Sequence, residues 1–204
     1  EPGVGVHNLD RHIRRLCVSA TCLGFGCDER RLRARLTELD PHGVAGPLRV
    51  RLLLARDGTV VVEHVPLRGS PEPVRLAVDT RSSPPPDLWC RHKSTRRDRY
   101  EAAAARRLDA DDVVLVDAHG RLIETTIANL AVQLDGRWWT PPLSSGCLPG
   151  IERARLLEGG ILTERALTVA DLARAEGLAV VSSLRGWRPA RLLADDRRAP
   201  ASLA

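Results

Sequence analysis

The chain has 204 residues, 43% of them hydrophobic, so it can bury the core of one domain or two small ones and is not a disordered tail. No stretch approaches about 18 consecutive apolar residues and no apolar segment follows a basic start, so neither a transmembrane helix nor a signal peptide is predicted. The net charge of +5 comes from basic residues scattered among acidic ones, which argues against a nucleic-acid-binding surface.

Two residue types have unusual counts. The chain contains no methionine, so we expect a domain cut from a longer chain or a processed form. It contains five cysteines, at positions 17, 22, 27, 90 and 147. The odd number and the lack of a Cys-x-x-Cys pair argue against a disulfide framework and against a metal site. We therefore expect free thiols in a reducing cytoplasm, with the first three, spaced by five, on different faces of a helix.

The first third of the chain reads as two helices followed by a strand hairpin. The expected elements are a helix over 9–23, a helix over 28–39, and strands over 48–55 and 59–66. Asn8 or Asp10 is expected to cap the first helix and Asp28 the second, and Gly24 to end the first. A polar, proline-containing linker over 69–73 is expected to separate a small α/β domain, 1–68, from a larger domain, 74–204.

The remaining chain alternates short strands with short helices. Strands are expected over 74–79, 113–117, 122–123, 128–134, 137–140 and 178–182, and helices over 97–108, 151–157 and 169–176. The alternation lacks a strict βαβ period. It therefore predicts an α+β fold and not a doubly wound parallel sheet.

Three features of this second part suggest chemistry. Lys93 is the chain's single lysine, and an amine can form a Schiff base with an aldehyde cofactor, which a guanidinium cannot. Glu124 ends a predicted strand, and a carboxylate there can keep a pyridine nitrogen protonated. The Gly-rich loop before Ile151 opens a helix whose N–H groups suit an anion such as phosphate. Taken alone, each also has a simpler interpretation: a surface lysine, a surface glutamate and an ordinary helix cap.

Taken together, these motifs resemble the class IV aminotransferases, which use pyridoxal 5′-phosphate (PLP). The motifs are Asn8 to Ala20, Glu124-Thr-Thr-Ile-Ala-Asn129, Thr140-Pro-Pro-Leu143 and Leu148-Pro-Gly-Ile-Glu-Arg153. Two further segments, His92 to Tyr100 and Ser183-Leu-Arg-Gly-Trp-Arg-Pro189, are similar to the 4-amino-4-deoxychorismate lyase domains of fused para-aminobenzoate synthases. The resemblance covers residues 8 to about 190 and implies the two-domain α+β architecture of fold-type-IV enzymes, like D-amino acid aminotransferase. A small α/β domain, lacking its first strands, would accompany a larger β-barrel-like domain.

The resemblance also implies roles for individual residues. Lys93 would be the Schiff-base lysine and proton carrier, and Glu124 would pair with the pyridine nitrogen. The phosphate would be held by Arg15, by main-chain N–H groups of Ile151 and Glu152, and by Ser183. In some members of the family a residue at the position of Arg51 meets a substrate carboxylate.

The activity implied is conversion of a small amino substrate, 4-amino-4-deoxychorismate, to para-aminobenzoate and pyruvate in folate biosynthesis. The family implies a cytoplasmic homodimer, fused to or partnered with an aminodeoxychorismate synthase component, without nucleic acid or membrane. Two alternatives stay open. One is an aminotransferase acting on a D- or branched-chain amino acid, and the other is a non-catalytic or nucleic-acid-binding module.

Overall fold

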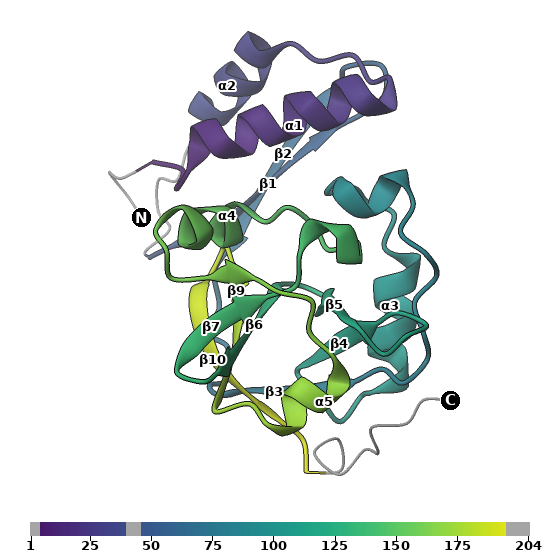
Figure 1. The fold of residues 1–204 in the computed structure, drawn as a ribbon. Helices are drawn as coiled ribbons and strands as arrows, with labels where there is room; N and C mark the ends of the chain where they lie inside the picture. Colours follow the sequence, from purple (N-terminus) through teal and green to yellow (C-terminus); the bar gives the residue numbers. More distant parts are fainter. Residues whose placement is uncertain (1–4, 40–45, 195–204) are drawn as a thin grey trace. The chain divides into compact units, whose positions relative to one another are not determined.

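Figure 1 shows a computed structural model of the chain, in which residues 5–39 and 46–194 are described. The chain divides into two compact units, residues 1–70 (unit 1) and 71–204 (unit 2). Each unit has its own sheet and its own apolar core.

Unit 1 packs two helices against one face of a two-stranded antiparallel ribbon. Its elements are α1 (Leu9–Leu23), α2 (Glu29–Thr37), β1 (Leu48–Leu54) and β2 (Val60–Pro66). Alternate ribbon residues such as Leu52 and Val62 turn towards Ile13 of α1 and Leu32 of α2, both buried. The two predicted helices and the hairpin are therefore confirmed.

The ends of these helices test the predicted caps. Asp28 caps α2, because its carboxylate accepts hydrogen bonds from the N–H groups of Arg30 and Arg31. Gly24 ends α1 in the left-handed conformation, at φ 69°. At the start of α1, Asn8 is the N-cap residue, as one of the two predicted candidates, but it does not cap through its side chain. Asn8 has a left-handed backbone (φ 56°) and makes no capping bond with its side chain, while Asp10 already lies in the first turn.

The first three cysteines do not share one helix as expected. The helix α1 ends at Leu23, so Cys27 lies in the connection to α2, and its thiol is 3.2 Å from the Cys17 sulfur. All five cysteines are free thiols.

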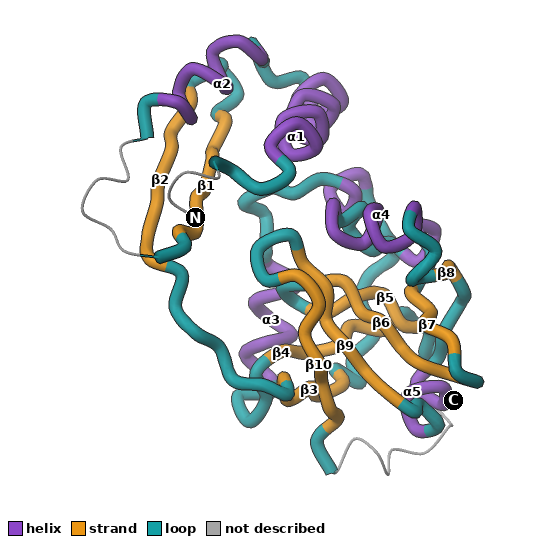
Figure 2. The backbone as a smooth tube through the Cα atoms, turned by 90° about the vertical axis from the view of Figure 1, so that its left-hand side faces the viewer, coloured by secondary structure: helices purple, strands orange, loops and turns teal. Residues whose placement is uncertain are grey.

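Unit 2 is built on a curled eight-stranded mixed sheet, drawn in orange in Figure 2. The strand order is β5-β4-β3-β10-β9-β6-β7-β8. The strands are β3 (Val74–Val78), β4 (Asp112–Val116), β5 (Leu122–Thr125), β6 (Asn129–Leu134), β7 (Arg137–Thr140), β8 (Thr163–Glu164), β9 (Gly177–Ser182) and β10 (Gly186–Leu192). β3 pairs in parallel with β4 and β10, whereas β9 pairs antiparallel with β6 and β10. This mixture confirms the α+β prediction.

Short helical segments connect the strands. They are η1 (Leu88–Arg91), α3 (Asp98–Arg106), η2 (Leu143–Ser145), α4 (Ile151–Glu158) and α5 (Val169–Ala173). One face of the sheet forms the main core, with Leu76, Val114, Leu130 and Val132 fully buried. Helix α4 packs over β9, where Leu156 and Leu157 meet a second cluster of buried side chains.

Several elements of unit 2 differ from the sequence prediction, and the short elements β8, η1 and η2 were not predicted at all. The helix expected over 169–176 ends at Ala173, because Arg174 is the C-cap. Strand β10 was not predicted, since Pro189 cannot donate a ladder hydrogen bond. The strand tolerates this proline because pairing with β3 begins only at Ala190.

Candidate active site

Glu124 is the buried centre of the candidate site. It lies on β5 with only 4% of its surface exposed. Its Oε1 accepts hydrogen bonds from the Tyr100 hydroxyl at 2.7 Å and from Arg99 Nη2 at 3.4 Å. Its Oε2 accepts from the main-chain N–H of Leu148 at 3.1 Å and from Asn129 Nδ2 at 3.3 Å. With donors on both oxygens, the carboxylate is held in one orientation.

Burial and neighbouring donors act on Glu124 in opposite directions. Burial raises the pKa of the Glu124 carboxyl above its ordinary value. Hydrogen bonds from Tyr100 and Leu148, and the positive charges of Arg99 and Lys93, lower this pKa in part. A buried acid with compensating donors is the kind of group that active sites use to hold or move a proton.

Asn129 connects Glu124 to the loop that precedes α4. Its Nδ2 donates to the Leu148 carbonyl at 2.9 Å as well as to Glu124. A Cβ built at Gly150 would lie 2.0 Å from Asn129 Oδ1, so a side chain at this position must displace the amide. Gly146, at φ 88°, likewise has no room, because its Cβ would lie 2.6 Å from Pro86 Cβ. The Gly-rich loop is therefore shaped around the same network as Glu124.

The N-terminus of α4 follows directly from this loop. Its N-cap, Gly150, supplies no side chain to the first turn. Among the described residues, the main-chain N–H groups of Ile151 and Glu152 have no hydrogen-bond acceptor. Unused N–H groups at the start of a helix favour an anion.

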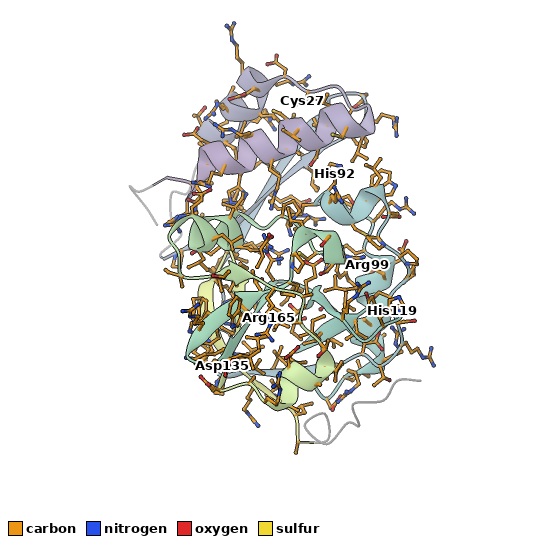
Figure 3. The ribbon with its side chains drawn as sticks, viewed as in Figure 1. Cys27, His92, Arg99, His119, Asp135 and Arg165 are labelled. Carbon is orange, nitrogen blue, oxygen red and sulfur yellow. The ribbon has the colours of Figure 1, made fainter. Side chains whose placement is uncertain are left out.

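Lys93 lies between η1 and α3 and is exposed. Its neighbour in the chain, His92, is labelled in Figure 3. The charge of Lys93 lowers the pKa of the Glu124 carboxyl in part. The Leu148 N–H contact ties the same carboxylate to the loop that leads into α4.

Ser183 lies in the turn between β9 and β10 and is partly buried. The turn follows the strand on which α4 packs.

Two of the predicted site residues lie in unit 1. Arg15 is on α1, is half-buried, and burial lowers the pKa of its guanidinium. Arg51 is on β1, on the ribbon face that points away from the helices, 3.7 Å from the Glu63 carboxylate. The exposed Arg49 shares this face, and both arginines line a cavity of about 190 Å³ with Glu63 and Val65.

Sequence reasoning missed three residues around Glu124. Asn129 and Tyr100 appear in the motifs but without a role, and Arg99 was one basic residue among many. Their contacts with Glu124 span 5, 24 and 25 positions of the chain. Only the Glu-x-x-x-x-Asn spacing of Asn129 offered a signal.

Neither a membrane span nor a metal centre is found in the described ranges 5–39 and 46–194. None of their helices is both long and apolar enough to cross a bilayer. No group of three or more His, Cys, Asp or Glu side chains in these ranges could hold a metal ion.

Comparison with known proteins identifies relatives along nearly the whole chain. A protein of Schizosaccharomyces pombe, named as an aminodeoxychorismate lyase, is 34% identical over 163 residues, which cover 76% of this chain and 70% of that protein. A protein from Mesorhizobium loti, named as an amino-acid aminotransferase, is 35% identical, with a TM-score of 0.87 and 95% of each chain covered. A 4-amino-4-deoxychorismate lyase from Pseudomonas aeruginosa is 26% identical, with a TM-score of 0.74, covering 92% of this chain and 78% of that one.

The family itself is shown by a broader match. The family model of amino-transferase class IV matches residues 3–193, and the structural neighbours are fold-type-IV enzymes. Members of this family depend on PLP. The chain therefore belongs to the class IV aminotransferases, a family of PLP-dependent enzymes.

Proposed function

We propose that the chain is a PLP-dependent lyase that converts 4-amino-4-deoxychorismate to para-aminobenzoate and pyruvate. The observation that carries this proposal is the 34% identity to a relative named as an aminodeoxychorismate lyase. The similarity to the Pseudomonas lyase supports the same reaction. The proposal places this reaction in folate biosynthesis. It includes a cytoplasmic location, a homodimer, and an aminodeoxychorismate synthase component as partner.

The residues of unit 2 fit the cofactor. Glu124 offers a buried carboxylate that suits a pyridine nitrogen, and the unused N–H groups of Ile151 and Glu152 suit a phosphate. Lys93 supplies the amine. We assign Ser183 and Arg15 to the phosphate as well, and Arg51 to a substrate carboxylate. The two arginines suit these roles because a guanidinium binds phosphates and carboxylates with paired hydrogen bonds.

When bound, the cofactor would supply a delocalised system that accepts the electrons released at the substrate carbon. Lys93 would remove the proton from that carbon and return it later. Glu124 would hold a proton at the ring nitrogen, and its four donors would stop it from turning away. Aromatisation of the product supplies much of the driving force, so the protein has mainly to position Lys93 and the substrate.

An aminotransferase is the second candidate. The Mesorhizobium aminotransferase is 35% identical and covers 95% of this chain, so the same residues also suit transfer of an amino group. Lys93 and Glu124 would have the same roles in the lyase reaction and in the aminotransferase reaction.

The acceptor requirement separates the two functions. We expect enzyme loaded with PLP to release pyruvate from 4-amino-4-deoxychorismate without any keto acid, measured by coupled lactate dehydrogenase. Lys93→Arg should release none. Turnover of an amino acid only when a keto acid is added, with no pyruvate from the lyase substrate, would contradict the lyase and favour the aminotransferase.

A further inference from the structure

A guanidinium lies beside the buried carboxylate at the centre of unit 2. Arg99 comes from α3, and its side chain is 19% exposed, against 5% for the Glu124 side chain. Figure 3 labels Arg99 beside α3. Its Nη2 is 3.4 Å from Glu124 Oε1, which is a long hydrogen bond but a close distance for two charges.

The position of Arg99 is built by other contacts, not by Glu124 alone. Its Nη1 donates to the Cys90 sulfur at 2.8 Å, which ties it to η1. Its Nη2 lies 2.6 Å from the Tyr100 hydroxyl and 3.4 Å from the Gly146 carbonyl. The guanidinium also lies 4.5 Å from the centre of the Tyr100 ring. A cation fixed on three sides does not depend on the carboxylate for its place.

We infer that Arg99 is a positioning residue that keeps the Glu124 carboxylate ionised and fixed before any cofactor arrives. The inference rests on the proposed function only in that Glu124 is the group meant to meet the pyridine nitrogen. In that role Glu124 accepts a hydrogen bond from a protonated ring nitrogen, and only its ionised form can do so with either oxygen.

Within the described residues, neutral donors and positive charges around Glu124 together decide whether its carboxyl is protonated. The Tyr100 hydroxyl, the Asn129 amide and the Leu148 N–H are neutral donors. The Cys147 thiol is neutral too, because burial raises its pKa to about 11. The positive charges are Arg99, in hydrogen-bond contact, and Lys93. Neutral donors offset only part of the cost of burying a charge, so removing Arg99 should protonate Glu124 at higher pH.

The single tyrosine of the chain makes this measurable without cofactor. Tyrosine labelled with ¹³C at Cζ gives one NMR signal, from a hydroxyl that donates to Glu124. A titration of the cofactor-free full chain from pH 4 to 9 should show the protonation of Glu124 as a step in this signal. Glu124→Gln should abolish the step and thereby assign it.

We expect the midpoint of this step to rise by about one to three pH units in Arg99→Met, because an opposite charge at this distance lowers the pKa of an acid by that amount. Arg99→Gln, which keeps a polar group near Tyr100, should move it in the same direction if the methionine variant is unfolded by circular dichroism. Arg96→Met is the matched control, since Arg96 is exposed and stacks on Trp89, and it should leave the midpoint unchanged.

A midpoint in the folded Arg99 variants equal to that of the unchanged protein would overturn the inference. That result would leave the proposed function intact, because no cofactor enters the measurement. Failure of the unchanged protein to bind PLP in a separate titration would instead overturn the proposed function, while a shifted midpoint would still support the role of Arg99 towards Glu124.

Discussion

Two of the buried carboxylates of unit 2 lie on neighbouring strands, and their surroundings differ. Glu124 of β5 is 4% exposed and Asp112 of β4 is 3% exposed. Both oxygens of Glu124 accept hydrogen bonds, whereas only Oδ1 of Asp112 does so and its Oδ2 has no partner. Burial raises the pKa of both acids.

The sources of the donors explain the difference. Asp112 receives its hydrogen bonds from the Val113 N–H and from the N–H and hydroxyl of Thr126, close to its own strand. Glu124 draws its donors from α3, from β6 and from the loop before α4. Asp112 thus fixes a turn after β5, while Glu124 joins three segments around a group that can meet a ligand. Burial by itself does not mark a functional acid.

The largest expected effect is a difference in turnover between variants of Glu124 and Asp112. We expect Glu124→Gln to bind PLP but to lose turnover by about 100-fold or more, because a neutral amide no longer holds the proton on the ring nitrogen. Asp112→Asn should keep turnover within about twofold, since Asp112 contacts only the turn. Steady-state kinetics with saturating PLP measures both. Equal losses of turnover in the two variants would contradict a functional difference between Glu124 and Asp112.

Arg15 is a cation that we assign to the cofactor phosphate, so its removal should act on binding, whereas removal of Glu124 should act on turnover. The phosphate does not react, so its contacts should matter equally before and during the reaction. Loss of one charge-assisted contact in Arg15→Ala should weaken PLP binding about 10- to 150-fold and leave saturated turnover nearly unchanged. Arg11→Ala, on the exposed side of the same helix, is the control. Equal PLP dissociation constants in the two variants would refute the phosphate role.

Gly150 allows a test of the Asn129 contact that supports Glu124. Its added Cβ in Gly150→Ala would meet Asn129 Oδ1 at 2.0 Å and push the amide away from Glu124. We expect a loss of about 1–3 kcal/mol in the free energy of unfolding, as for other overpacked sites, together with weaker PLP binding. Gly69→Ala meets nothing within 4 Å and should change neither. Urea unfolding and a PLP titration give the two values. If Gly150→Ala matches the unchanged protein in both, the loop accommodates the added methyl group without displacing Asn129.

The smallest effect concerns Asp112 and pH. Its folded-state pKa is raised above the unfolded value, so between these two values the folded chain binds more protons than the unfolded chain. Stability should therefore fall as pH rises through this window, by about 1.4 kcal/mol for each pH unit. Because the pKa of Glu124 is raised as well, Asp112→Asn should show a smaller slope, and not a flat line, in urea unfolding measured from pH 4 to 7. A variant with the same slope as the unchanged protein would show that Asp112 does not titrate there.

The site was partly predictable because its reactive groups stand in ordered motifs. Lys93 is the only lysine, and the Glu-x-x-x-x-Asn and Leu-Pro-Gly-Ile spacings mark Glu124 and Ile151. The supporting contacts were not predictable. Arg99 reaches Glu124, 25 positions further along the chain, only because α3 packs beside β4 and β4 pairs with β5.

The fold shows the same limit. Apolar periodicity indicated most strands and helices, because alternation and helical spacing are local patterns. It could not indicate β10, because Pro189 and two arginines interrupt its few apolar residues and the strand is stabilised by β3, more than 100 positions earlier in the chain. The left-handed Asn8 was missed for a related reason, since the residue type suits either a cap or that conformation.

The most direct test of the account is to trap PLP on the chain. Incubation with PLP, reduction with borohydride and peptide mapping should place one label on Lys93, where the only competing amine is that of the N-terminus. Lys93→Arg, which keeps the charge, should take up no label at the corresponding peptide. Absence of label from the unchanged protein, or label only at the N-terminal amine, would contradict the assignment of Lys93 and with it the proposed chemistry.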